Sequence, residues 1–107
     1  QGQCALYVRQ ALEAGGINTD NHPVAARLYG PYLESWGFSA VNTTNFQSGD
    51  LAVIQGYPGG SSDSNGIPYG HIQMYNGSVW ISDFRQNGFW PGPGYRKYTP
   101  DYIIYRK

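Results

Sequence analysis

The order of hydrophobic patterns along the chain constrains the fold more than any other sequence feature. Residues 4–14 repeat apolar side chains with helical spacing, since Ala5, Val8 and Leu12 form one stripe. The second half of the chain changes to short apolar runs separated by turn residues, which is typical of strands. Helices that come first and antiparallel strands that follow define an α+β fold. We therefore expect N-terminal helices packed on an antiparallel β-sheet.

Two further helices are predicted before the sheet begins. One opens at Pro23, because proline is favoured at the first helical position, and runs to Gly30. The other covers residues 31–36 and stops at Gly37. The helical part of the domain is thus expected to end before residue 40.

Strands and long loops alternate in the rest of the chain. Strands are predicted at residues 51–55, 71–75, 79–84 and 102–105. The dipeptide Asn76-Gly77 is a strong signal for a hairpin between the middle two strands. Two segments rich in Gly, Pro and aromatic residues are predicted to be loops, namely residues 56–70 and 85–100. Loops of this length in a small domain are often functional, and we expect both to border a substrate groove.

Length and charge exclude several classes of function. The 107 residues suit a single domain, residues 1–107. The formal net charge at pH 7 is zero, which argues against a nucleic-acid partner. No apolar run approaches the roughly 20 residues of a membrane span, so no membrane partner is expected. One cysteine and two scattered histidines lack the spacing of metal ligands, so neither a metal nor another cofactor is expected. Because the chain starts with Gln1, a processed product or an excised domain is expected.

The single cysteine, Cys4, stands where the first predicted helix begins. Unpaired N–H groups and the helix dipole stabilise a thiolate at such a position. His71 opens a predicted strand directly after Gly70, and an imidazole near the thiol can take its proton and return it to a leaving amine. Taken singly, Cys4 also suits a buried helix residue and His71 a polar residue at a strand edge. Together they favour a nucleophile and its base.

Asp83, on the next predicted strand, is the candidate that orients the His71 ring through its second nitrogen. The geometry of the hairpin decides whether it can. A strict two-residue turn pairs His71 with Ser82 and turns Asp83 to the opposite face of the sheet. A connection of odd length puts His71 and Asp83 on one face. The sequence leaves both forms open, and the triad requires the odd one, which we predict.

Several segments resemble cysteine peptidoglycan amidases and endopeptidases of the CHAP and NlpC/P60 type. The segment GQCALYVRQALEAGG resembles their nucleophile helix, GDLAVI their first core strand and GHIQMYNG their histidine strand. The segment YGPYLESWGF is similar to one in small bacterial members, including type VI secretion amidase effectors. The resemblance covers nearly the whole chain in the right order. It implies a papain-like core, with Cys4 as nucleophile, His71 as base and Asp83 as third member.

The resemblance also implies a substrate and partners. The substrate is an amide in a peptidoglycan stem peptide or cross-link, and the oxyanion donors include the Cys4 backbone N–H, with Gln3 and Tyr7 as candidate side chains. Trp90 is expected to be exposed and to contact the substrate. The predicted function is thus a cysteine hydrolase of the bacterial cell wall, secreted or delivered to the bacterial periplasm. It would be an antibacterial effector or lysin, with a cognate immunity or inhibitor protein as a candidate partner.

Two alternatives remain open at this stage. A deamidase or acyltransferase would keep the papain-like fold and change the chemistry. A non-catalytic binding module would use the loops rich in Tyr and Trp and would leave Cys4 as an inert thiol.

Overall fold

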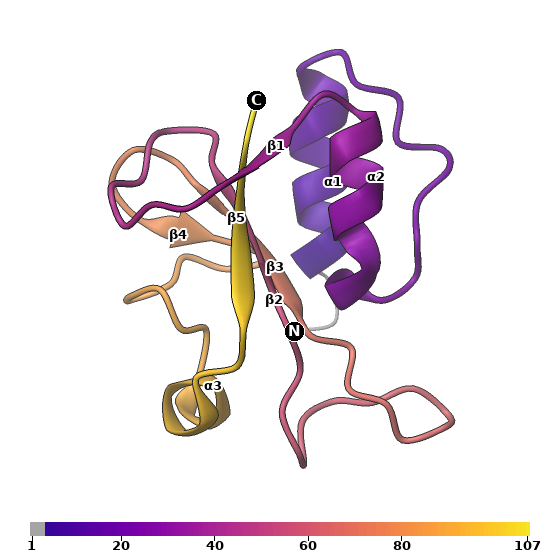
Figure 1. Cartoon of the computed structure of the whole chain (residues 1–107), viewed down its shortest axis with the longest axis vertical. Coiled ribbons are helices and arrows are strands. Elements are labelled where there is room, and N and C mark those ends of the chain that lie inside the picture. Colours follow the sequence, from indigo (N-terminus) through magenta and orange to yellow (C-terminus); the bar gives the residue numbers. More distant parts are fainter. Residues whose placement is uncertain (1–3) are drawn as a thin grey trace.

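A five-stranded antiparallel sheet, in the order β1-β5-β2-β3-β4, forms the centre of the protein in a computed structural model (Figure 1). The structure describes residues 4–107. The strands are β1 (Ser39–Val41), β2 (Leu51–Ile54), β3 (His71–Tyr75), β4 (Trp80–Ile81) and β5 (Tyr102–Arg106). The helical elements are α1 (Cys4–Ala14), the 3-10 turn η1 (Ala26–Leu28), α2 (Tyr29–Ser35) and α3 (Pro93–Tyr98). The predicted α+β class, with N-terminal helices against an antiparallel sheet, is confirmed.

One face of the sheet packs against α1 and α2, which lie side by side in Figure 1. Val8 and Leu12 are buried from α1, as the predicted stripe requires. The helical and strand residues that complete this core are Ala26, Tyr29, Leu33, Phe38, Leu51, Val53, Ile72 and Tyr105. Because α1 packs directly on β3, the start of α1 comes to lie near the start of that strand.

The other face of the sheet carries a second, more aromatic core. Ala52 and Ile54 point to this side of β2, and they pack with Trp80 and Ile104. Further aromatic rings cover the cluster, namely Phe46, Tyr75, Phe89, Trp90 and Tyr95. Since β2 has a core on both of its faces, all four of its residues are buried, as its unbroken apolar sequence predicts.

The prediction of a helix that opens at Pro23 is wrong. The chain bends there, η1 follows, and α2 begins at Tyr29, two residues before the predicted start. Gly30 does not end a helix but lies inside α2. A larger residue would not fit there, because a Cβ at this position would overlap the hydroxyl group of Tyr105. Close packing on β5 therefore explains a glycine that resembles a stop signal. Within residues 4–107, no helix is long and apolar enough to cross a membrane.

The predicted bounds of several other helices and strands are also wrong. The segment predicted as a loop over residues 85–100 contains α3, which has Pro93 in its first turn and is followed by the capping residue Thr99, with φ of 40°. Strand β4 is shorter than the predicted strand of residues 79–84. Strand β1 was not expected, and it pairs with β5 at the sheet edge. All three elements are too short to give a periodic hydrophobic pattern.

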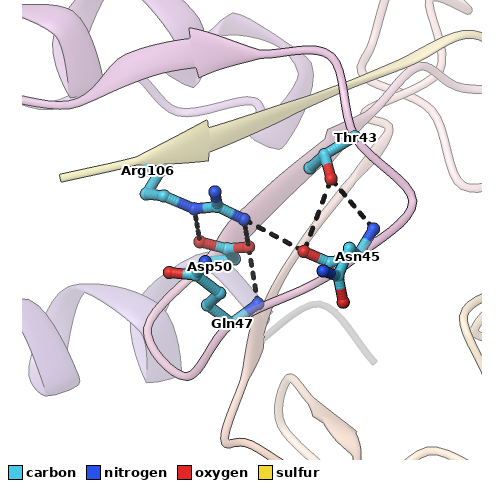
Figure 2. A network of polar contacts seen from close by, with 5 residues as sticks. All are labelled: Thr43, Asn45, Gln47, Asp50 and Arg106. Atoms are coloured by element: carbon cyan, nitrogen blue, oxygen red, sulfur yellow. Dashed lines mark hydrogen bonds and ion pairs between the residues drawn. The ribbon is translucent and has the colours of Figure 1, made fainter.

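An ion pair between the buried Asp50 and the partly exposed Arg106 joins the connection between β1 and β2 to the end of β5 (Figure 2). Arg106 donates from Nε to Asp50 Oδ1 at 2.9 Å and from a terminal nitrogen to Oδ2 at 2.8 Å. The backbone N–H of Gln47 adds a third bond to the Asp50 carboxylate at 2.9 Å. Arg106 also donates to the carbonyl of Asn45. The hydrogen bond from Arg106, helped by that from Gln47, lowers the pKa of Asp50.

Candidate active site

Gly70 turns the chain from the 56–70 loop into β3. Its φ is +74°, a conformation that L side chains rarely adopt. A Cβ at this position would also overlap the carbonyl oxygen of Ile54 and the side chain of Arg27. The backbone N–H of Arg27 donates a hydrogen bond to the carbonyl of Tyr69 at 2.9 Å, which also fixes the backbone just before β3. The residue that follows, His71, is therefore set at the start of β3 by a close approach that only glycine permits.

Cys4 is the first described residue of α1 and is half-buried against the helical core. Burial raises the pKa of its thiol. Hydrogen bonds with the backbone of Ile72 and Ala5 lower that pKa, and the charge of Asp83 raises it again. The net direction is upward, so burial outweighs the stabilisation of the thiolate that the helix N-terminus was expected to give. This direction favours the thiol as the resting form of the side chain.

A cavity of about 440 Å³ brings the predicted catalytic residues together. Cys4, His71 and Asp83 all line it. The 56–70 loop contributes Tyr57, Ser61, Tyr69 and Gly70 to the wall, and the 85–100 segment contributes residues 91–95. The remaining lining residues are Ala5, Val24, Ala26 and Phe84. Both segments that were expected to border a groove thus border the cavity that holds the cysteine and the histidine.

The His71 ring is held by Gln86, a residue that sequence reasoning missed. Its Nε2 lies 3.1 Å from Gln86 Oε1, which also accepts a bond from Ser82 Oγ at 3.1 Å. The amide nitrogen of Gln86 donates to the carbonyls of Gly88 and Phe89, each at 3.1 Å. These two acceptors fix the orientation of the amide, so its oxygen faces His71 and needs a donor there. The network therefore assigns the proton to Nε2 and leaves Nδ1 free to accept a proton.

The hairpin explains why Gln86 supplies the bond that was expected from Asp83. Tyr75 pairs with Trp80, so the connection has four residues, and the predicted odd length is wrong. Strand β4 then ends at Ile81, and the chain bends before the N–H of Gln86 returns to the carbonyl of Trp80 at 2.9 Å. Gln86 lies outside any regular strand, so no alternation in the sequence points to it.

The pKa of His71 is lowered, mainly because the ring is buried with 7% of its surface exposed. The hydrogen bond to Gln86 and the charge of Asp83 partly offset this effect. The ring is consequently neutral at pH 7 and can act as a base without first losing a proton. A thiol and a neutral imidazole that share one cavity form a pair suited to proton transfer during attack.

Two of the residues predicted to contact the substrate, Tyr7 and Trp90, are not among the residues that line this cavity. Tyr7 is exposed on α1 and does not line the cavity. Trp90 packs edge-to-face on Phe89 and Tyr102, with centroid distances of 4.9 Å and 5.9 Å. Gln3 lies outside the described residues. Among residues 4–107, no three His, Cys, Asp or Glu side chains gather as a metal site.

Comparisons with known proteins place the fold beside one bacterial system. No protein-family model and no curated protein matches the chain. Its fold and sequence are similar to a chain in the crystal structure of the native type VI effector-immunity complex Tae3-Tai3 from Ralstonia pickettii. That chain is 45% identical, with a TM-score of 0.85, and the match covers 98% of this chain and 82% of that one. The selenomethionine form of the complex matches with 44% identity and a TM-score of 0.79, over 97% and 85% of the two chains.

Proposed function

The chain belongs to the Tae3 family of type VI effectors, and we propose that it is a peptidoglycan amidase that uses Cys4 as its nucleophile. The observation that carries this proposal is the meeting of Cys4 and His71 in one cavity, with the His71 ring held through Nε2 by Gln86. The Cys helix against the His strand would be a papain-like arrangement. The alternatives of the same fold, a deamidase or an acyltransferase, would use the same pair on a different substrate.

The chemistry follows from the protonation states of the pair. His71 Nδ1 takes the thiol proton while Cys4 Sγ attacks the carbonyl carbon, so a C–S bond forms and the carbonyl π electrons move to oxygen. The tetrahedral intermediate collapses and expels the amine, which receives the proton from His71. A water molecule, deprotonated by His71, then hydrolyses the thioester and restores the Cys4 thiol. Asp83 adds negative charge at the cavity wall and favours the imidazolium that forms midway.

The surroundings of the cavity support a peptide substrate and a protein inhibitor. Asp83 is the one acid among the described lining residues, and no Lys or Arg is among them. The rings of Tyr57, Tyr69 and Tyr95 lie on the same wall, and aromatic faces of this kind suit contact with a stem peptide or cross-link. At the cavity wall, Val24 is 88% exposed and Phe84 is 39% exposed, which offers apolar contact area to an immunity protein. The site of action that we propose is the periplasm of a target cell.

The test is digestion of purified peptidoglycan, followed by mass spectrometry of the soluble products. The wild-type protein should release new stem-peptide fragments. Cys4→Ala should release none while keeping its circular dichroism spectrum and melting temperature. Substantial turnover by a folded Cys4→Ala protein would end the cysteine-hydrolase proposal. Ammonia release without new fragments would favour a deamidase, and sedimentation with the wall without any product would favour a binding module.

A further inference from the structure

Tyr95 lines the same cavity as Cys4 and His71, and it comes from α3. Its ring centroid lies 5.8 Å from that of His71, with the two planes inclined by 53°. On another side it meets Tyr57 edge-to-face, with the centroids 4.8 Å apart. The Tyr95 ring is therefore held between the proposed base and a residue of the 56–70 loop.

The packing around α3 keeps this ring in place. Tyr57 stacks on Tyr98 at 5.4 Å, with 14° between the planes. Gly94 lets Tyr57 approach the helix, because a Cβ there would overlap the Tyr57 ring. Tyr57 thus packs against Gly94, Tyr95 and Tyr98 of α3. The position of the Tyr95 ring is therefore set by several contacts rather than by its own rotamer alone.

The hydroxyl group of Tyr95 is available as a donor. Burial raises the pKa of Tyr95 to about 12, and the negative charges of ionised Cys4 and Tyr57 act in the same direction. The phenol therefore keeps its proton at neutral pH. Within the described part of the chain, this hydroxyl takes part in no hydrogen bond, although half-buried tyrosines normally find a partner. Because Tyr95 and Cys4 line one cavity, an anion formed beside the sulfur would face a phenol that retains its proton.

We propose that the Tyr95 hydroxyl donates a hydrogen bond to the oxyanion that forms when Cys4 attacks the substrate carbonyl. In this step the C–S bond forms, the carbonyl π electrons move to oxygen, and the thiol proton passes to His71, while Tyr95 keeps its own proton. The backbone N–H of Cys4 is the second donor. The inference rests on the proposed function and adds a catalytic residue to it, within the 85–100 segment that the sequence predicted to be a loop bordering the substrate groove.

The variant Tyr95→Phe tests this role, because it removes the hydroxyl and keeps the ring against His71 and Tyr57. Loss of one oxyanion donor typically lowers kcat by about 10²-fold to 10³-fold, and we expect a loss in that range with KM little changed. A peptide aldehyde, which forms a tetrahedral adduct with Cys4, should bind more weakly by a similar factor. Alkylation of Cys4 by iodoacetamide forms no oxyanion, so its rate should stay the same. The matched control is Tyr98→Phe, on the exposed side of the same helix, which should behave as wild type.

Each outcome decides the matter. Wild-type kcat and aldehyde affinity in Tyr95→Phe would overturn the role of Tyr95 and leave the proposed function intact. A loss of kcat accompanied by an equal loss of alkylation rate would also overturn it, because the hydroxyl would then support the position of Cys4 instead. A wild-type protein that neither cleaves peptidoglycan nor binds the aldehyde would overturn both proposals.

Discussion

At the scale of single residues, Gln86 determines which nitrogen of His71 is free to accept a proton. Substitution of Gln86 should therefore change the pH dependence of activity in a direction that can be predicted. Gln86→Glu keeps an acceptor for Nε2 and adds a negative charge, which favours the imidazolium and raises the pKa of His71. Because the base is neutral only above this pKa, the acidic limb of kcat/KM should move to higher pH. Gln86→Leu removes the acceptor and frees the ring, and misplacement of this kind costs on the order of 10²-fold in kcat. Activity on a soluble wall peptide, measured across pH, reports both effects.

The matched variant is Asp83→Asn, which removes the charge and retains the Gln86 bond. Since the charge of Asp83 raises the pKa of His71, its loss should move the acidic limb to lower pH. Its effect on kcat should be smaller than that of Gln86→Leu. If Asp83→Asn abolished activity and Gln86→Leu retained it, the acid rather than the amide would orient the ring.

A second prediction at this scale concerns the reactivity of Cys4 without substrate. The pKa of the thiol is raised above its ordinary value, so the thiolate fraction is small at neutral pH and grows as pH rises. The rate of alkylation by iodoacetamide should therefore increase steadily between about pH 6 and pH 9. N-acetylcysteine at the same pH values is the reference, and Cys4 should react more slowly than it does. A rate that is already constant near neutral pH would indicate a resting thiolate–imidazolium pair instead.

The residues that could be predicted from sequence are those whose position depends on local structure. Cys4 at a helix start and His71 at a strand start needed only the first helix and one strand to be right. The predicted role of Asp83 depended on the parity of a hairpin, which is set by tertiary packing and not by the Asn-Gly pair alone. Gln86 and Tyr95 come from a segment without periodicity, and only folding brings them to the cavity.

At the scale of elements, Gly70 fixes the entry into β3 and so the place of His71. Gly70→Ala should lower the free energy of unfolding by at least about 1–3 kcal/mol, because the residue keeps a positive φ and its Cβ meets Ile54 and Arg27. Gly66→Ala is the matched control, since its φ is +78° and nothing lies within 4 Å of the added Cβ. Both variants strain a positive φ, but only Gly70→Ala adds a Cβ overlap. The difference between their free energies of unfolding, measured by thermal unfolding, therefore reports the overlap. An equal loss in both would contradict the close approach at Gly70.

The longer a helix or strand is, the more accurately it could be predicted from the sequence. Helix α1 and the buried strands β2, β3 and β5 carry enough apolar residues for the period to be visible. Helix α2 was misplaced because Pro23 and Gly30 were taken as local signals, whereas Gly30 is required by the ring of Tyr105 packed on it. Helix α3 depends on tyrosine contacts with the 56–70 loop, which no local pattern contains.

At the scale of the whole molecule, the Asp50–Arg106 pair connects distant parts of the chain, and its contribution depends on pH. The folded pKa of Asp50 is lowered, so its stabilising effect is complete above the unfolded value of about 3.9 and is lost as pH falls through the folded value. The melting temperature of the wild-type protein should therefore decrease on acidification below about pH 4. Asp50→Asn should melt lower at neutral pH and depend less on pH in that range.

The control for this prediction is Asp101→Asn, an exposed acid before β5, which should retain the wild-type pH dependence. A wild-type melting temperature that responds to acid no more than that of Asp50→Asn would contradict the stabilising role of the pair.

The 56–70 loop, finally, divides the molecule in a way that matters beyond catalysis. Cys4 lies before the loop, whereas His71, Gln86 and Tyr95 lie after it, and the two parts meet through the β2–β3 ladder and the packing of α1 on β3. A chain cut at the exposed Gly59 would give two fragments, each of them chemically silent by itself. Recovery of the proposed activity would then measure reassembly of the fragments, so the same fold would also serve as a two-part reporter of association.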